Sequence, residues 1–367
     1  MKPSPTTAGA AWRDPWIATA LLAALALRVT MARGGLWLDE AWSAVMAHDV
    51  GTPMGVIAGI NHDNNHPLNS WWLQLVGLGA PPLLARALSI ICSVGTILPA
   101  ATFATRRGAA AGRAAAWLFA LSPTLVLLGS EARGYAPALL ALVILVDQVD
   151  PLRDGPPPSP TTLAMIGLFG TLGHLLMLPA ICLVGAWLVL ARRDLRAAVG
   201  GAVRALAPAF AASLAVASLL FGAAYLVKGG IRIGSTTPFD GPAFAAALLE
   251  LVQMTLGVAG GLLLVLIIVG PPPSRTDVAL GLALGLGLPV AAVLFQVPNT
   301  HISRYFVMSS LVLLWLVATR FGAQIQGRRV HRVVACALLG GILMAMATTD
   351  ARVIGAARGE PDLPVRL

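Results

Sequence analysis

Apolar runs of roughly 20 residues recur along the whole chain, separated by short breaks rich in arginine, proline or glycine. About 20 residues is the length at which an α-helix crosses the ~30 Å hydrocarbon core of a bilayer. Of the 367 residues, 57% are hydrophobic and 11% are charged, against about 25% charged in soluble domains. The pattern predicts an all-α polytopic membrane protein. Because no break is long enough for a separate soluble or nucleotide-binding domain, we expect residues 1–367 to form a single integral-membrane domain.

The distribution of basic residues predicts the orientation. The net charge of +9 does not indicate a nucleic-acid partner, because the positive charges stand in short clusters between apolar runs, as the positive-inside rule describes. About eleven crossings, N-terminus inside and C-terminus outside, put fifteen Lys and Arg residues on the cytoplasmic side and eight outside. No small-residue cleavage site follows the first run, which begins at Trp16, so we expect that helix to be retained. The Ala-, Gly- and Arg-rich composition indicates a bacterial cytoplasmic-membrane protein.

Several segments depart from simple spans. Residues 161–191 form either one long tilted helix or two short ones, and a break near Gly173-His174 keeps the arginines that follow on the inside. Residues 243–270 exceed one span and predict an interfacial helix followed by a crossing. We expect Arg28 to snorkel to the surface, and the three cysteines to be small core residues. Other expected crossings include about 16–31, 82–105, 114–129, 136–149, 205–227, 278–297 and 333–347, with a short outer tail at 349–367.

A long outer loop, residues 34–81, carries Asp39 and Glu40 among tryptophans. Its apolar stretch 67–78 is too short to span and predicts an interfacial helix with Pro67 in the first turn. Neighbouring helical side chains point about 100° apart, so one carboxylate would act as base while the other positions the loop. The structural alternative is a solvated helix start, with Asp39 as N-cap. We favour the functional pair because flanking tryptophans suit a membrane interface or a sugar face.

The same loop contains a run of Asn, His and Asp residues at 61–66, followed by Pro67. His62 and His66 stand four apart, which on a helix is metal-ligand spacing. The Asn- and Asp-rich composition indicates a loop instead. We therefore expect His66 in a hydrogen-bonding wall of the site, with a bound divalent metal or plain loop capping as the alternatives.

Two arginines follow one pattern, since Arg133 and Arg304 each stand beside a tyrosine, Tyr135 or Tyr305, at the predicted outer edge of a crossing. The planar guanidinium matches phosphate oxygens and stays charged in a low-dielectric site. The alternative is a snorkelling arginine beside an aromatic-belt tyrosine. Weaker candidates on the same predicted side are Glu131, His174 and Lys228.

Together these residues predict one type of reaction. A carboxylate removes a proton from an acceptor while arginines hold a departing phosphate. Because we find no nucleotide-binding segment in the sequence, the activated group is expected to arrive on a lipid.

The order of the motifs resembles that of bacterial GT-C superfamily glycosyltransferases, the polytopic group related to protein O-mannosyltransferases and the aminoarabinose transferase of lipid A. The resemblance extends over about residues 15–320. It rests on four segments in order: Leu-Trp-Leu-Asp-Glu-Ala at 36–41, His-Pro-Leu at 66–68, Ser-Glu-Ala-Arg-Gly-Tyr at 130–135 and Ser-Arg-Tyr-Phe at 303–306. Leu68 replaces the second proline of the family's His-Pro-Pro element, and the tyrosines that usually follow are absent.

This resemblance implies an inverting transfer of one sugar from a polyprenyl-phosphate donor to a glycan, lipid or protein acceptor on the periplasmic side. It makes Asp39 the general base with Glu40 as its companion, and it implies donor-phosphate contacts for Arg133 and Arg304, to which we add Lys228. The family is divided on metal use, so it implies no cofactor. The expected substrate-binding residues are His66, Glu131, Tyr135, His174 and Tyr305.

A lipid-linked sugar flippase or transporter is the alternative function. It would need polar residues along the whole pathway and at the membrane midplane. The predicted crossings have few ionisable residues at mid-depth, which disfavours this alternative.

Overall fold

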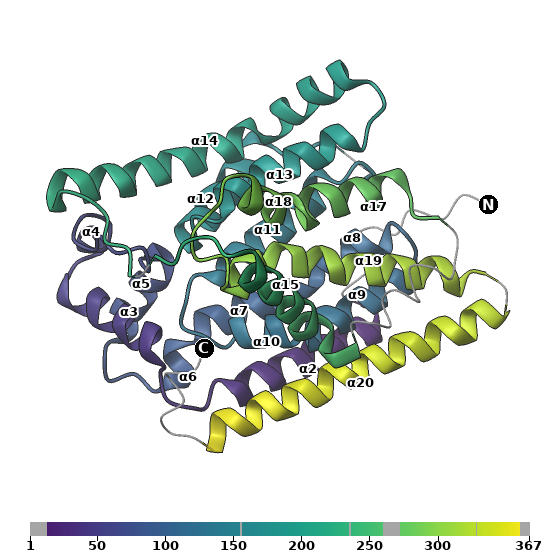
Figure 1. Cartoon of the computed structure of the whole chain (residues 1–367), viewed down its shortest axis with the longest axis horizontal. Coiled ribbons are helices and arrows are strands. Elements are labelled where there is room, and N and C mark those ends of the chain that lie inside the picture. The colour runs from purple at the N-terminus through teal and green to yellow at the C-terminus, as the bar shows by residue number, and fades with distance from the viewer. Residues whose placement is uncertain (1–12, 155, 235, 260–271, 328, 360–367) are drawn as a thin grey trace.

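The computed structural model of the chain describes residues 13–154, 156–234, 236–259, 272–327 and 329–359. Within these ranges the regular elements are helices and none is a strand, so the prediction of an all-α fold is confirmed. The longer helices run mainly along the long axis of the molecule (Figure 1). One end of that axis is formed by four short helices, α3 (Leu38–Asp49), α4 (Pro53–Ala58), α5 (Pro67–Val76) and α6 (Pro82–Ala85).

This end corresponds to the predicted outer loop. The interfacial helix expected at 67–78 is α5, which begins with Pro67, as expected because a proline in the first turn lacks only an N–H that would be unpaired anyway. The sequence analysis did not predict α4. It begins after Thr52, whose side chain accepts a hydrogen bond from Gly55 N at 3.0 Å.

The first half of the bundle contains short helices with defined breaks. The predicted break at Gly173-His174 is confirmed, because one helix ends at Gly173 and the next begins at Met177. Pro123 interrupts the predicted crossing at 114–129, since proline cannot donate a helical hydrogen bond. The helices are α2 (Pro15–Met31), α7 (Ala87–Gly95), α8 (Ile97–Thr105), α9 (Ala109–Leu121), α10 (Pro123–Leu128), α11 (Tyr135–Val149), α12 (Pro160–Gly173) and α13 (Met177–Leu190).

Two helices of the second half are longer than expected. The helix predicted from residue 205 begins at Leu195, where the Asp194 side chain caps Ala197 N, and the helix predicted to end at 347 continues to Gly359. An interfacial helix and a crossing were proposed at 243–270, and residues 260–270 of this segment lie outside the described residues. The elements are α14 (Leu195–Lys228), α15 (Gly241–Leu256), η1 (Gly257–Ala259), α17 (Arg275–Leu280), η2 (Gly281–Gly285), α18 (Gly287–Leu294), η3 (Ser303–Phe306), α19 (Val307–Ile325) and α20 (Arg329–Gly359).

Four of the described helical stretches are long and apolar enough to cross a membrane: Ala87–Thr105, Leu195–Lys228, Ser303–Ile325 and Arg329–Ala356. A pair bent by 41°, Arg275–Gly285 with Gly287–Leu294, would make a fifth. Shorter apolar helices of 10–17 residues accompany them. These helices agree with a helical membrane protein, and the number of eleven crossings stays a prediction.

The main core cluster is largely aliphatic and includes a group of packed aromatic side chains. Trp315 packs against Phe103 and Phe119, with ring centroids 4.7 and 5.5 Å apart, and the Trp187 ring lies 6.1 Å from that of Phe103. All four side chains are fully buried.

The prediction that Arg28 snorkels is wrong. Its guanidinium is fully buried and donates to Ser93 Oγ at 2.7 Å, to Ala120 O at 2.9 Å and to Phe119 O at 3.2 Å. The proline at position 123 explains this contact, because the carbonyl oxygen of Phe119 would otherwise accept from the N–H that Pro123 lacks.

The prediction that all three cysteines are core residues is also wrong for two of them. Cys92 is buried, whereas Cys182 and Cys336 are exposed on apolar helices. All three are free thiols.

Candidate functional site

Asp39 lies in the first turn of α3 and contacts two arginines. Its Oδ2 atom is 2.9 Å from Arg133 Nη1 and 3.4 Å from Arg304 Nη2. Arg133 precedes α11 and Arg304 belongs to η3, so the ion pairs join three segments that are far apart in the sequence. The Asp39 side chain is 27% exposed and that of Arg304 is 23% exposed. The structure therefore brings together, at an accessible place, the three residues that the sequence analysis favoured most.

Glu40, the neighbouring carboxylate, has a different environment. It is fully buried, and its oxygens accept from Trp37 N at 3.0 Å, from Arg86 Nε at 2.8 Å and from the backbone N–H of Ala132. Both carboxylate oxygens are therefore occupied, and Glu40 holds α3 against two other segments rather than facing a ligand. Arg86 completes the contact by donating to the carbonyl oxygens of Ala32, Gly34 and Gly35.

The connection between α10 and α11, residues 129–134, presents Arg133 to the site. Besides the bond from Ala132 N to Glu40, Asn69 Nδ2 donates to Ala132 O at 2.6 Å and Ser89 Oγ donates to Arg133 O at 3.0 Å. Three neighbouring segments thus fix the backbone on both sides of the guanidinium. This arrangement gives Glu40 the positioning role that one member of the pair was expected to have.

Gly134 allows a close approach of backbones at the start of α11. A Cβ atom at this position would collide with the carbonyl oxygen of Gly173 and would lie 2.7 Å from His66 Cβ. A hydrogen atom alone therefore fits between α11, the end of α12 and the start of α5.

Asn64, from the predicted hydrogen-bonding loop, connects the ion pair to α3. Its Oδ1 accepts from Arg133 Nη2 at 2.7 Å, and its Nδ2 donates to Ser43 Oγ at 3.0 Å and to Asp39 O at 3.2 Å. The amide thereby orients the guanidinium toward the Asp39 carboxylate.

His66, His174 and Tyr135 form an aromatic stack behind Arg133. The ring centroids of the two histidines are 4.6 Å apart, and those of His174 and Tyr135 are 4.5 Å apart. Both histidines lie in connections between helices. Burial, followed by the nearby positive charges, lowers the pKa of His66 well below 6.5 and that of His174 to about 3. Both imidazoles are therefore neutral at physiological pH.

Glu131 is a second carboxyl group at the site. It lies in the connection before α11, and burial raises its pKa to about 7, a shift that Arg133 partly opposes and Glu40 reinforces. Its Oε2 atom is buried without a hydrogen-bond partner among the described residues. Near neutral pH the Glu131 carboxyl is therefore able to hold or release a proton.

Other polar atoms around the arginines also lack partners. In the part of the chain that the structure describes, no hydrogen bond is made by Trp37 Nε1, His66 Nε2, Arg133 Nε or Arg304 Nε. The Trp37 ring centroid lies 5.4 Å from the guanidinium carbons of both arginines. Buried polar atoms in proteins nearly always have a partner, so this group is suited to binding a polar ligand or water.

One predicted site residue lies apart from this group. Lys228 is exposed at the end of α14, and the described residues provide no ion pair for it. Tyr305 packs against the apolar cluster of Phe244 and Phe306 and lies within electrostatic range of Tyr135, a member of the site. The loop after α14 nevertheless reaches the first outer loop, because Arg232 N donates to Asn61 O at 2.6 Å and Asp63 N donates to Arg232 O at 3.0 Å.

The divalent metal considered for His62 and His66 finds no ligand set. No group of three or more His, Cys, Asp or Glu side chains within the described ranges is arranged to hold a metal ion. His62 Nδ1 instead lies 2.8 Å from Asp63 Oδ1, and His66 stacks on His174.

The sequence analysis missed the roles of Arg86 and Asn64. A signal for Arg86 was present, since it is a charged residue in the apolar stretch 82–105, and such a residue needs a buried partner. Asn64 was expected in the hydrogen-bonding loop, but its contact with Arg133 was not predicted. Compared with known proteins, the sequence matches no family model and no curated protein.

Proposed function

We propose that this protein is an inverting glycosyltransferase of the bacterial cytoplasmic membrane, which moves one sugar from a polyprenyl-phosphate donor to an acceptor on the periplasmic side. One observation carries the proposal: the accessible Asp39 carboxylate contacts Arg133 and Arg304, whereas the adjacent Glu40 is fully engaged in structural contacts. An accessible carboxylate next to two guanidinium groups is what a base and a phosphate site require. The resemblance of the four motifs to GT-C enzymes supports the same assignment.

The charges around Asp39 favour an anionic ligand. Arg133 and Arg304 face the partly exposed Asp39 carboxylate, so positive charge is in excess while the nearby Glu131 carboxyl holds its proton. A donor phosphate that binds Arg133 and Arg304 has to compete with Asp39, because both ion pairs are made to the same Oδ2 atom. Donor binding therefore releases the Asp39 carboxylate and makes it available as a base.

The proposed reaction is a single displacement. Asp39 takes the proton of an acceptor hydroxyl as that oxygen forms a bond to the anomeric carbon. The bond from the anomeric carbon to the phosphate oxygen breaks at the same time, and the polyprenyl phosphate leaves with the electron pair. Arg133 and Arg304 stabilise the negative charge that grows on this phosphate. Attack opposite to the leaving group inverts the anomeric configuration.

Purified protein incubated with a panel of polyprenyl-phosphate sugars tests the proposal, with release of the lipid phosphate as the readout. We expect release by the wild type and none by Asp39→Asn. Asp49→Asn, which changes an exposed aspartate at the other end of the same helix, is the matched control and should retain activity. Release by Asp39→Asn at the wild-type rate would contradict the assignment. Movement of donor across a proteoliposome without release would instead indicate a flippase.

A further inference from the structure

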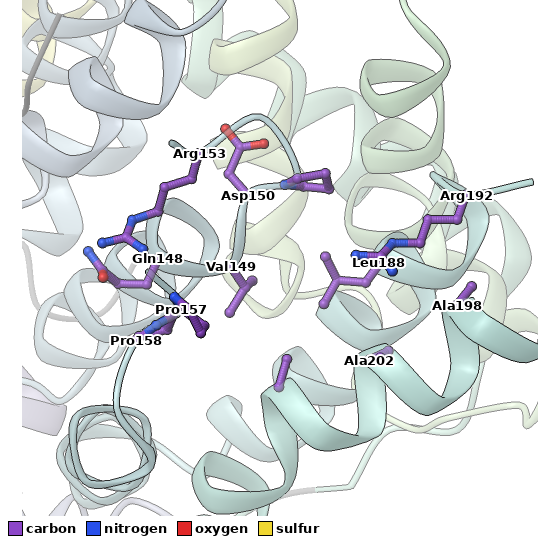
Figure 2. Close-up of a pocket in the computed structure, with 13 residues that line it drawn as sticks. Gln148, Val149, Asp150, Arg153, Pro157, Pro158, Leu188, Arg192, Ala198 and Ala202 are labelled. Atoms are coloured by element: carbon purple, nitrogen blue, oxygen red, sulfur yellow. The ribbon is translucent and has the colours of Figure 1, made fainter. Parts of the chain in front are cut away.

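A pocket of about 270 Å³ opens where α11 ends and α13 leads into α14 (Figure 2). It is remote from Asp39, because α11 extends from Tyr135 in the candidate site to Val149 at the pocket. At 1.5 Å per residue, the 15 residues of α11 separate the two places by about 22 Å. The pocket is therefore distinct from the proposed transferase site.

Two arginines face the pocket. Figure 2 shows Arg153 with Gln148 on one side and Arg192 with Leu188 on the other. The Arg192 guanidinium has no ion pair with any described residue, and Arg153 Nη1 donates to the neutral carbonyl of Pro156 at 2.6 Å.

The carboxylate of Asp150, which also lines the pocket, does not neutralise this charge. It is fully buried and paired with Arg106 and Arg107, whose nitrogens lie 3.1 and 3.0 Å from its Oδ2 atom. The pocket lining thus has two arginines and one carboxylate, and its net charge is positive although Asp147 of the neighbouring cluster also attracts Arg153.

The remaining wall is mostly apolar, with prolines of the loop after α11 on one side and helices on the other. Leu188 of α13 and Ala198, Ala202 and Ala205 of α14 line it. Gly201 makes room for the guanidinium, because a Cβ atom there would lie 3.3 Å from Arg192 Nη1. A fully hydrated small anion gains little from such a wall, whereas a charged group attached to an apolar body fits both parts of the pocket.

The helices also indicate where such a molecule comes from. Most of the apolar length of α14 is exposed, as expected for a helix that faces lipid acyl chains. The pocket lies at the first turns of this helix, next to Arg193 and Arg196. A lipid lying along α14 would place its head group at Arg192. Basic pockets between helices at the cytoplasmic membrane surface bind anionic head groups in this way.

We propose that the pocket formed by α11, α13 and α14 binds the phosphate-bearing head group of an anionic phospholipid. The lipid phosphate contacts Arg192 and Arg153, and the glycerol and first acyl carbons contact the alanine face of α14. This site is independent of the proposed transfer reaction.

Thermal unfolding of the full-length protein in neutral detergent tests the proposal. We expect added phosphatidylglycerol to raise the Tm more than phosphatidylcholine with the same acyl chains. The double variant Arg153→Gln/Arg192→Gln should need about ten times more phosphatidylglycerol for the same shift. Arg196→Gln, which removes an exposed arginine outside the pocket, should respond like the wild type.

A second variant guards against misfolding of the double mutant. Gly201→Leu places a side chain in the pocket without removing charge, and leucine has a higher helix propensity than glycine. It too should lose the selective response to phosphatidylglycerol. An equal response to both lipids, or an unchanged response in both pocket variants, would overturn the proposal. An equal shift with glycerol phosphate would assign the pocket to a soluble anion and overturn the lipid assignment.

Discussion

Two clusters of arginine and aspartate stand at opposite ends of the bundle and differ in burial and in how completely they are paired. In the cluster that we call the α8 cluster, Arg106 pairs with Asp147 and Asp150 at 2.8 and 3.1 Å, and Arg107 pairs with Asp150 and Asp277 at 3.0 and 2.7 Å. Three carboxylates thus surround two guanidinium groups and connect α8 to α11 and α17.

Around Asp39 the proportion is reversed. Arg133 and Arg304 share one partly exposed carboxylate, and their Nε atoms have no partner in the described part of the chain. Each cluster joins helices, but the α8 cluster has no arginine left for an anion. An arginine in a membrane protein therefore indicates a ligand site when it is accessible and its positive charge is not fully paired.

The largest expected difference between the two clusters is in stability. Asp150→Ala leaves two buried arginines short of a partner, and breaking such a buried pair costs about 3–5 kcal/mol. Asp39→Ala removes a partly exposed partner and should cost about 1 kcal/mol or less. The Tm of each purified variant checks this order. Asp154→Ala, an exposed neighbour of the cluster, is the control, and equal losses for Asp150→Ala and Asp39→Ala would contradict the comparison.

The next effect concerns the packing that positions Arg133. Gly134→Ala forces a methyl group against Gly173 and His66, and such overpacking costs about 1–3 kcal/mol. Because the same segment carries Arg133, transferase activity should fall together with the Tm. Gly200→Ala is the matched control, since its added methyl group meets no atom within 4 Å. A Gly134→Ala protein with wild-type Tm and activity would show that the contact is not needed.

A pH-dependent effect is expected from Glu131. Its raised pKa of about 7 means that the folded chain keeps a proton that the unfolded chain loses near pH 4.5. The resulting stabilisation is complete below pH 4.5 and is lost as the pH rises through 7. At about 1.4 kcal/mol per pH unit, it amounts to at most about 3 kcal/mol. Glu131→Gln, which stays neutral, should not show this loss.

The difference in Tm between wild type and Glu131→Gln, measured from pH 5 to pH 8, isolates this group. The lowered pKa values of His66 and His174 act in the opposite direction, because acidification below about pH 6.5 protonates these histidines in the unfolded chain first. Both proteins contain the histidines, so their contribution cancels. A difference in Tm that does not vary with pH would exclude the proposed titration of Glu131.

The smallest expected effect is a difference in donor KM between variants of Arg304 and Lys228, two of the predicted phosphate contacts. Arg304→Gln should raise the KM for a polyprenyl-phosphate donor about tenfold, as expected for the loss of one charge-assisted hydrogen bond worth about 1.5 kcal/mol. Lys228→Gln should leave the KM unchanged, because Lys228 lies exposed at the end of α14. Steady-state kinetics with one donor decides between the two, and an equal rise in both would bring Lys228 back to the phosphate site.

Local patterns made parts of the fold predictable. The break at Gly173-His174 followed from the charge of the arginines after 191, and α5 followed from an apolar stretch that begins with proline. The position of Asp39 next to Arg133 and Arg304 was expected from their common predicted side of the membrane. These features depend either on residues close in sequence or on the positive-inside rule, which applies to the whole chain.

Contacts between distant segments were not predictable in the same way. Glu40 differs from Asp39 because Arg86, 46 positions away, reaches it, and no local pattern encodes that pairing. Arg28 is buried because a proline on another helix leaves a carbonyl unpaired. In both cases tertiary packing determines the partner, and short sequence motifs carry no information about that packing.

Donor binding and turnover measured on the same preparation of Asp39→Asn separate the role of a base from that of a phosphate contact. We expect that binding of a polyprenyl-phosphate sugar is retained or becomes tighter, because Arg133 and Arg304 no longer pair with a carboxylate at position 39. We also expect that turnover falls by about 10²–10⁴-fold, the usual contribution of a general base. Turnover at the wild-type rate, or loss of donor binding in a folded protein, would contradict the assignment of Asp39 as the base beside a phosphate site.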